Sequence, residues 1–258
     1  MFATLLAFLA FMTHVFVANA EPGNWMLPML ALIMLLAAIY SIFSIAFRYR
    51  IALYIIQSIC LVIITVQVSI ANGTIDSNYL FLIITAAFKI FIIPFFLYRS
   101  LSFGMKLMPL HFYLRFVAAK KNTRSRLESD PLFMQSHMST SRALFYAGIL
   151  VALSFLISSV LGGTTLMLPI AASIILIGML IIASKSHLIL QLFGFLIMEN
   201  GVVLLPSALH IRLPLIGETI ALIDVVILVA IALLLSFKMR ETHGTLDTKK
   251  FMELVEQR

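Results

Sequence analysis

The chain has 258 residues, of which 62% are hydrophobic and only 11% are charged. Soluble domains contain roughly 25% charged and roughly 45–50% apolar residues, so this chain has too few polar side chains to cover a water-soluble globule. The composition excludes a cytosolic enzyme, a nucleic-acid-binding module and a secreted disulfide scaffold, and it indicates an integral membrane protein. The net charge of +7 is concentrated between the apolar runs, where it marks orientation and contact with anionic membrane lipid.

Eight apolar runs follow one another along the chain, and each is long enough to cross about 30 Å of hydrocarbon as an α-helix. They are residues 2–20, 24–47, 51–71, 79–98, 143–161, 165–184, 187–209 and 218–237. No segment alternates apolar and polar residues with the period of two that membrane β-strands show. We therefore expect an all-α, polytopic membrane bundle of about eight transmembrane helices.

The chain divides into five parts on this pattern. They are a transmembrane or signal-like segment at 1–20, a three-helix membrane part at 21–99, a basic cytoplasmic loop at 100–142, a four-helix membrane part at 143–237 and a cytoplasmic tail at 238–258. The first run ends in Ala-Asn-Ala, as a cleavable signal peptide does, but it lacks a basic n-region. Cleavage there would leave seven helices. The basic loop is interpreted either as an interfacial helix or, because its second half is dense in charge, as a solvated linker.

Basic residues occupy alternate connections between the runs, and such residues mark the cytoplasmic side of a membrane protein. They include Arg48 and Arg50 in the turn after the second run, the stretch 99–142, Lys185, and Lys238 with Arg240. Arg212 is the exception to this alternation. The pattern predicts a cytoplasmic C-terminus.

Three ionisable residues lie well inside the apolar runs: Lys89, Glu199 and Asp224. A charge at the bilayer centre costs at least about 2.5–3.5 kcal/mol, so each must face protein or water, or be neutral. The helical rise of 1.5 Å per residue places all three about 15 to 21 Å from the cytoplasmic ends of their helices. They therefore share a depth near the mid-plane.

Three charges of both signs at one depth suggest a lateral polar path that takes up and releases protons. The alternative is a static pair of Lys89 with a carboxylate that holds helices together. His187, at the cytoplasmic end of its run, is a further candidate for the proton path, although a histidine at a helix end is commonly just hydrated. Gln57, Gln67 and Gln191 are expected to donate hydrogen bonds between helices, and Gly194 and Gly201 to allow close helix approach.

The sequence carries no catalytic signature of its own. Cys60 is the single cysteine and the histidines are scattered, so no metal or iron–sulfur centre is expected. No phosphate-binding glycine loop is present. We expect no bound cofactor, and any redox chemistry would belong to partner subunits.

Two segments resemble the hydrogenase-4 component E (HyfE) family. They are Gln191 to Gly201, which reads Gln-Leu-Phe-Gly-Phe-Leu-Ile-Met-Glu-Asn-Gly, and the tail Thr-His-Gly-Thr-Leu-Asp at 242–247. Phe88-Lys89 followed by Pro94 is similar to a third helix of that family. The resemblance covers residues from about 25 to 250. It implies a membrane subunit of a proton-coupled group 4 hydrogenase, such as formate hydrogenlyase.

The last three helices are also similar to the NuoK subunit of respiratory complex I and the MrpC subunit of cation/proton antiporters, which carry two membrane glutamates. The first family glutamate corresponds to Leu196, so Glu199 lies one turn further along the same face, and the second corresponds to Asp224. The resemblance implies that Glu199 and Asp224 belong to the central hydrophilic axis of a proton-translocating membrane arm.

The resemblance also implies partners and a location. The chain is expected to be a non-catalytic subunit in the bacterial inner membrane, assembled with antiporter-like membrane subunits and hydrogenase-like peripheral subunits. The first run and the long basic loop depart from the family pattern. They leave open an alternative, a subunit of an Mrp-type cation/proton antiporter complex.

Overall fold

The computed structural model describes seven stretches and one single residue of the chain. These are residues 25–44, 47–71, 83–97, 138–160, 165–185, 188–209, 227 and 229–231. Five helices in this part of the chain are long and apolar enough to cross a membrane. They are α2 (Met26–Phe43), α3 (Phe47–Ala71), α8 (Thr140–Val160), α9 (Met167–Ser184) and α10 (Leu188–Ala208). A shorter apolar helix, Ile83–Leu97, contains the π-helical turn η1 (Phe88–Ile92).

These helices confirm the predicted all-α, polytopic membrane bundle. Each of the six described helices corresponds to one predicted apolar run, with ends that differ by a few residues. The first predicted run, 2–20, lies outside the described residues, and so does most of the last predicted run, 218–237. So do most of the basic loop at 100–142 and the tail at 238–258. The prediction of about eight spans and the division into five parts therefore stay predictions.

The turn predicted at residues 48–50 is wrong, because α3 begins at Phe47 and includes both arginines. Arg50 lies in the first turn of α3 and is only 5% exposed. Its Nε and one terminal nitrogen donate hydrogen bonds of 2.8 and 2.6 Å to the carbonyl of Ser44, which follows the end of α2. Since the last carbonyls of a helix carry partial negative charge, this cation is stabilised there without a solvated turn.

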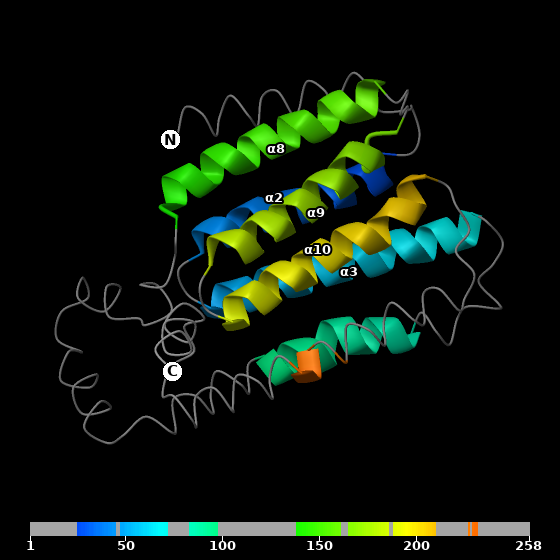
Figure 1. The fold of residues 1–258 in the computed structure, drawn as a ribbon. Helices are drawn as coiled ribbons and strands as arrows, with labels where there is room; N and C mark the ends of the chain where they lie inside the picture. The colour runs from blue at the N-terminus through cyan, green and yellow to red at the C-terminus, as the bar shows by residue number, and fades with distance from the viewer. Residues whose placement is uncertain are drawn as a thin grey trace.

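The helices lie side by side in a layered bundle (Figure 1). The centre is formed by α2, α3, α9 and α10, which contact one another in the pairs α2 with α3, α9 with α10, α2 with α9, and α3 with α10. On one side α8 covers α9 and α2, and on the other the Ile83–Leu97 helix packs against α3. The central helices therefore bury side chains on several faces.

Two of the glutamines that the sequence predicts as interhelical donors connect α3 to α2. The Gln57 amide donates to the carbonyl of Met34 at 2.9 Å, and the Gln67 amide lies 2.9 Å from the sulfur of Met26. Both bonds cross between antiparallel helices, as the sequence predicts. Such polar contacts are a common device where apolar packing against lipid gives no net driving force.

Glycines let α9 and α10 approach closely. A Cβ atom added to Gly178 on α9 would lie 2.6 Å from the backbone nitrogen of Met198 on α10. The predicted role of Gly194 and Gly201 is confirmed, because a Cβ at either position would come within 2.9 Å of α9 atoms. Glu199 therefore lies on a helix that is closely packed against its neighbour.

Two contacts show that α3 and α10 run parallel and in register. Arg50, near the start of α3, interacts electrostatically with Lys185, which lies three residues before the start of α10. Four residues further along α3, Tyr54 makes an edge-to-face contact with Phe193, with ring centroids 6.3 Å apart. Residues after Tyr54 and after Phe193 therefore rise together along the two helices.

Candidate functional site

Lys89 lies on the Ile83–Leu97 helix, inside the π-helical turn η1. The turn is closed by a hydrogen bond from the N–H of Ile93 to the carbonyl of Phe88, five residues earlier. Pro94 follows directly, and it has no N–H to offer the carbonyl of Ile90. A widened turn before a proline is a local departure from α-helix of the kind that often occurs at functional sites.

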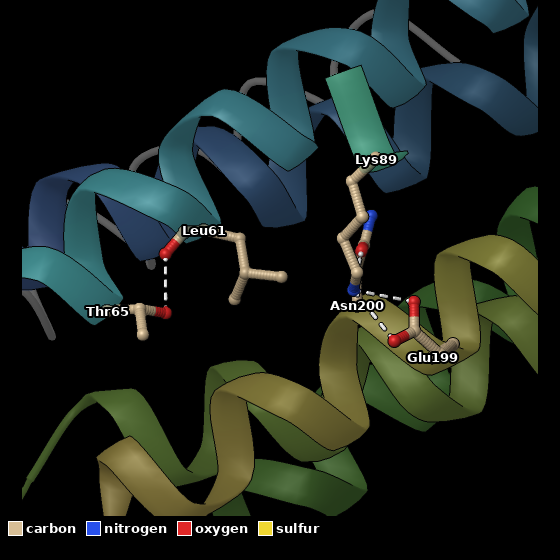
Figure 2. A network of polar contacts seen from close by, with 5 residues as sticks. All are labelled: Leu61, Thr65, Lys89, Glu199 and Asn200. Carbon is tan, nitrogen blue, oxygen red and sulfur yellow. Dashed lines mark hydrogen bonds and ion pairs between the residues drawn. The ribbon is translucent and has the colours of Figure 1, made fainter. Parts of the chain in front are cut away.

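Glu199 and Asn200 are consecutive residues in the middle of α10, and both are buried. The face of α10 with Gly194 and Gly201 is pressed against α9. The two polar side chains reach away from the α10 backbone toward the Ile83–Leu97 helix (Figure 2). The close packing of α9 and α10 therefore fixes the position from which the carboxylate extends.

The Lys89 ammonium joins the two helices. Its Nζ lies 2.7 Å from each carboxylate oxygen of Glu199 and 3.1 Å from the Oδ1 of Asn200 (Figure 2). A lysine ammonium has three N–H donors, so these three contacts account for all of them. The two charged side chains are 2% and 8% exposed. The group is a buried, compact ion pair with one neutral acceptor beside it.

Burying such a pair carries a large desolvation cost, which the mutual attraction of the charges offsets only when geometry and hydrogen bonding are good. The bidentate contact and the Asn200 acceptor provide that geometry. Chemically, the contact can carry a proton from nitrogen to oxygen, which converts two opposite charges into a neutral pair.

The structure brings together two of the four predicted proton-path residues, Lys89 and Glu199. Asp224 and His187 lie outside the described residues. Asn200 was not singled out from the sequence, although a carboxamide directly after a mid-membrane glutamate is a signal that could have marked it. In the described part of the chain no group of three or more His, Cys, Asp or Glu side chains could hold a metal ion.

A second cluster of charge lies at one end of the bundle. Lys185 follows the last residue of α9, and Arg50 lies across from it on α3. Burial, together with the positive charge of Arg50, lowers the pKa of Lys185 to about 8. The Lys185 carbonyl accepts a hydrogen bond of 2.8 Å from Gln191. This end of the bundle therefore holds a permanently charged arginine beside a lysine whose pKa lies close to neutral pH, and Lys185 is two residues before His187.

The described helices define a multi-pass membrane protein, and comparisons with known proteins refine this class. Residues 166–256 match the family of NADH-ubiquinone/plastoquinone oxidoreductase chain 4L. The matched segment includes α9, α10 and Glu199, whereas Lys89 lies before it. The predicted NuoK-like character of the last helices is thereby confirmed.

The chain is also similar to hydrogenase-4 component E. It is 31% identical over 140 residues to that protein from Escherichia coli strain K12 and to that from Shigella flexneri, covering 53% of this chain and 63% of each relative. A Mycobacterium tuberculosis protein described as uncharacterized is 31% identical over 93 residues, 36% of this chain and 42% of that protein. The matched region thus spans less than two thirds of each relative's length. No solved structure matches the chain.

Proposed function

We propose that this chain is a non-catalytic membrane subunit of a proton-translocating, complex I-like group 4 hydrogenase, and that the Lys89–Glu199 pair is part of its proton path. Two similarities support the proposal, to chain 4L of NADH-ubiquinone/plastoquinone oxidoreductase and to hydrogenase-4 component E. In this proposal the partners are antiporter-like membrane subunits and hydrogenase-like peripheral subunits, in a bacterial inner membrane.

The observation that carries the proposal is the buried contact between Lys89 and both oxygens of Glu199. Proton transfer along it breaks one N–H bond of the ammonium and forms an O–H bond on the carboxylate. The neutral acid can then release its proton to a further acceptor, after which the amine takes a proton from the opposite side and restores the pair. Each cycle moves one proton past the contact without any net change in the two residues.

The direction of transfer must be set by other charges, because each step of this cycle is reversible. Asp224 and His187 are proposed as the neighbouring proton-path groups, on the basis of sequence position. All three Lys89 donors are engaged in the contact already described. In this proposal Asp224 therefore interacts with water or a neighbouring subunit instead of sharing Lys89.

The test is proton translocation per turnover in the assembled complex carrying Glu199→Gln. The amide keeps the size and one acceptor oxygen of the side chain, but it cannot titrate. Assembly on blue-native gels is expected to persist while coupled translocation falls, and Asp224→Asn should act similarly. Arg142→Gln is the matched control, since Arg142 is exposed and bonded to Ser139 within its own segment.

Two outcomes would contradict the proposal. Normal coupling in both the Glu199→Gln and Asp224→Asn variants would show that protons do not pass through these two residues. Loss of subunit abundance without a coupling defect in the complexes that remain would instead indicate a static pair. An operon containing antiporter subunits and no hydrogenase-like genes would favour the alternative, an Mrp-type antiporter subunit.

A further inference from the structure

Five buried polar atoms on the Ile83–Leu97 helix, α3 and α10 have no hydrogen-bond partner among the described residues. Three belong to α3: the hydroxyls of Tyr54 and Ser58 and the amide oxygen of Gln57. The others are the side-chain nitrogen of Asn200 and the hydroxyl of Thr85. Tyr54 and Ser58 lie near each other, one helical turn apart, but neither completes a hydrogen bond of good geometry.

The α3 atoms lie near the ion pair, and Ser58 lies almost at the height of Glu199. Tyr54 and Phe193 are level with each other in the parallel helices α3 and α10. Ser58 is four residues beyond Tyr54 and Glu199 six beyond Phe193, so their heights differ by only about 3 Å. Tyr54 also interacts electrostatically with Glu199.

The Ile83–Leu97 helix contributes the remaining atom. Thr85 precedes Lys89 by four residues, so the two side chains share one helix face. Their helix packs against α3. The five atoms therefore come from three helices that contact one another, the Ile83–Leu97 helix, α3 and α10.

Several buried polar atoms without a hydrogen-bond partner in one region indicate bound water. More than nine in ten buried polar groups in proteins have a hydrogen-bond partner, from protein or from ordered water. Leaving one unsatisfied costs about 1–3 kcal/mol. Buried waters typically make about three hydrogen bonds each, and these residues offer donors and acceptors from hydroxyl, carboxamide and charged groups.

We propose that Tyr54, Gln57 and Ser58 on α3 form, with Asn200 and Thr85, a hydrated polar pocket that extends the Lys89–Glu199 site. The pocket holds water against the carboxylate, and the Tyr54 hydroxyl is its positioning group. Protons released by Glu199 move along these waters, each step breaking one O–H bond and forming another. This role rests on the proposed function, whereas the hydration itself does not.

Hydration is tested by radiolytic labelling of the intact complex. Ionising a bound water releases a hydroxyl radical, which oxidises the nearest reactive side chain. Tyr54 and Phe193 are both 0% exposed, which makes Phe193 the internal control. Tyr54 is expected to be oxidised several times faster than Phe193, and Ser58→Val should suppress this by removing one water-binding hydroxyl. Equal, slow oxidation of both rings would overturn the proposal.

The role of the pocket is tested by the rate of proton translocation. Tyr54→Phe combined with Ser58→Ala removes two hydroxyls and keeps the packing, so assembly should be unchanged. The rate of proton translocation should fall by roughly tenfold or more, since a positioned proton-transfer group contributes at least that much to the rate. The matched control is Thr65→Val, because the Thr65 hydroxyl on the same helix is bonded to Leu61 (Figure 2).

The outcomes separate the two proposals. A normal rate of proton translocation in the double variant, alongside uncoupling by Glu199→Gln, would overturn the pocket's role while the proposed function stands. Fast Tyr54 oxidation with normal coupling in both the Glu199→Gln and Asp224→Asn variants would support the hydration and contradict the proton path.

Discussion

The ammonium nitrogen of Lys89 lies 2.7 Å from both carboxylate oxygens of Glu199, a residue 110 positions further along the chain. Glu199 belongs to the segment that matches chain 4L, and Lys89 does not. The chain-4L-like part therefore supplies only one half of the charged contact. The preceding helices are needed to complete it, which explains why the site depends on how the two parts of the chain pack together.

The first prediction concerns the pair as a unit. Glu199→Leu alone, or Lys89→Met alone, leaves a buried charge without its partner, and breaking a buried pair costs about 3–5 kcal/mol. Each single variant should therefore lower the amount of assembled complex on blue-native gels, unlike Glu199→Gln, whose amide oxygen still accepts a hydrogen bond from the Lys89 ammonium. The double variant should restore it, because apolar residues of similar volume replace a buried pair at little cost. A double variant as depleted as the singles would show that the residues do not act as a pair.

The depth of the charged residues could be predicted from the sequence, but their contacts could not. Helical rise alone placed Lys89 and Glu199 near the same level, because apolar run lengths define where each helix enters the membrane. Which helix faces which depends on packing between segments far apart in the chain. The contact of Asn200 with Lys89 carries no periodic signal, so it became evident only in the structure.

The error at Arg50 has a different cause. Charges between apolar runs usually lie in solvated turns, and the sequence gives no sign that Arg50 bonds the carbonyl of Ser44. That contact lets α3 begin at Phe47, close behind α2. Hydropathy marks the apolar length of a helix, whereas its true start depends on such capping contacts.

The second prediction concerns the contact between α9 and α10. Gly178→Ala would place a methyl group 2.6 Å from the backbone of Met198, so the helices must separate. Overpacking of this kind typically costs about 1–3 kcal/mol, and the thermal stability of the purified protein should fall accordingly. Gly148→Ala on α8 is the matched control, because nothing lies within 4 Å of its added Cβ. Equal losses in both variants would contradict the close approach.

The third prediction concerns orientation. The basic connections predict that the C-terminal tail lies in the cytoplasm. Alkaline phosphatase fused after Arg258 should therefore be inactive, since that enzyme needs the oxidising periplasm to form its disulfides. A fluorescent protein that folds only in the cytoplasm is the complementary control at the same site. Strong phosphatase activity would overturn the predicted topology.

The fourth prediction concerns pH and Lys185, whose pKa is lowered to about 8 by burial and by the positive charge of Arg50. In the unfolded chain a lysine has a pKa of about 10.4. Between these values the unfolded chain binds a proton that the folded protein lacks, so the free energy of unfolding should rise as pH increases. Thermal unfolding in detergent should show this gain between about pH 8 and pH 10 for the unmodified protein. Lys185→Arg should remove the gain, because a guanidinium stays charged throughout this range. Identical pH dependence in the two proteins would show that Lys185 does not titrate there.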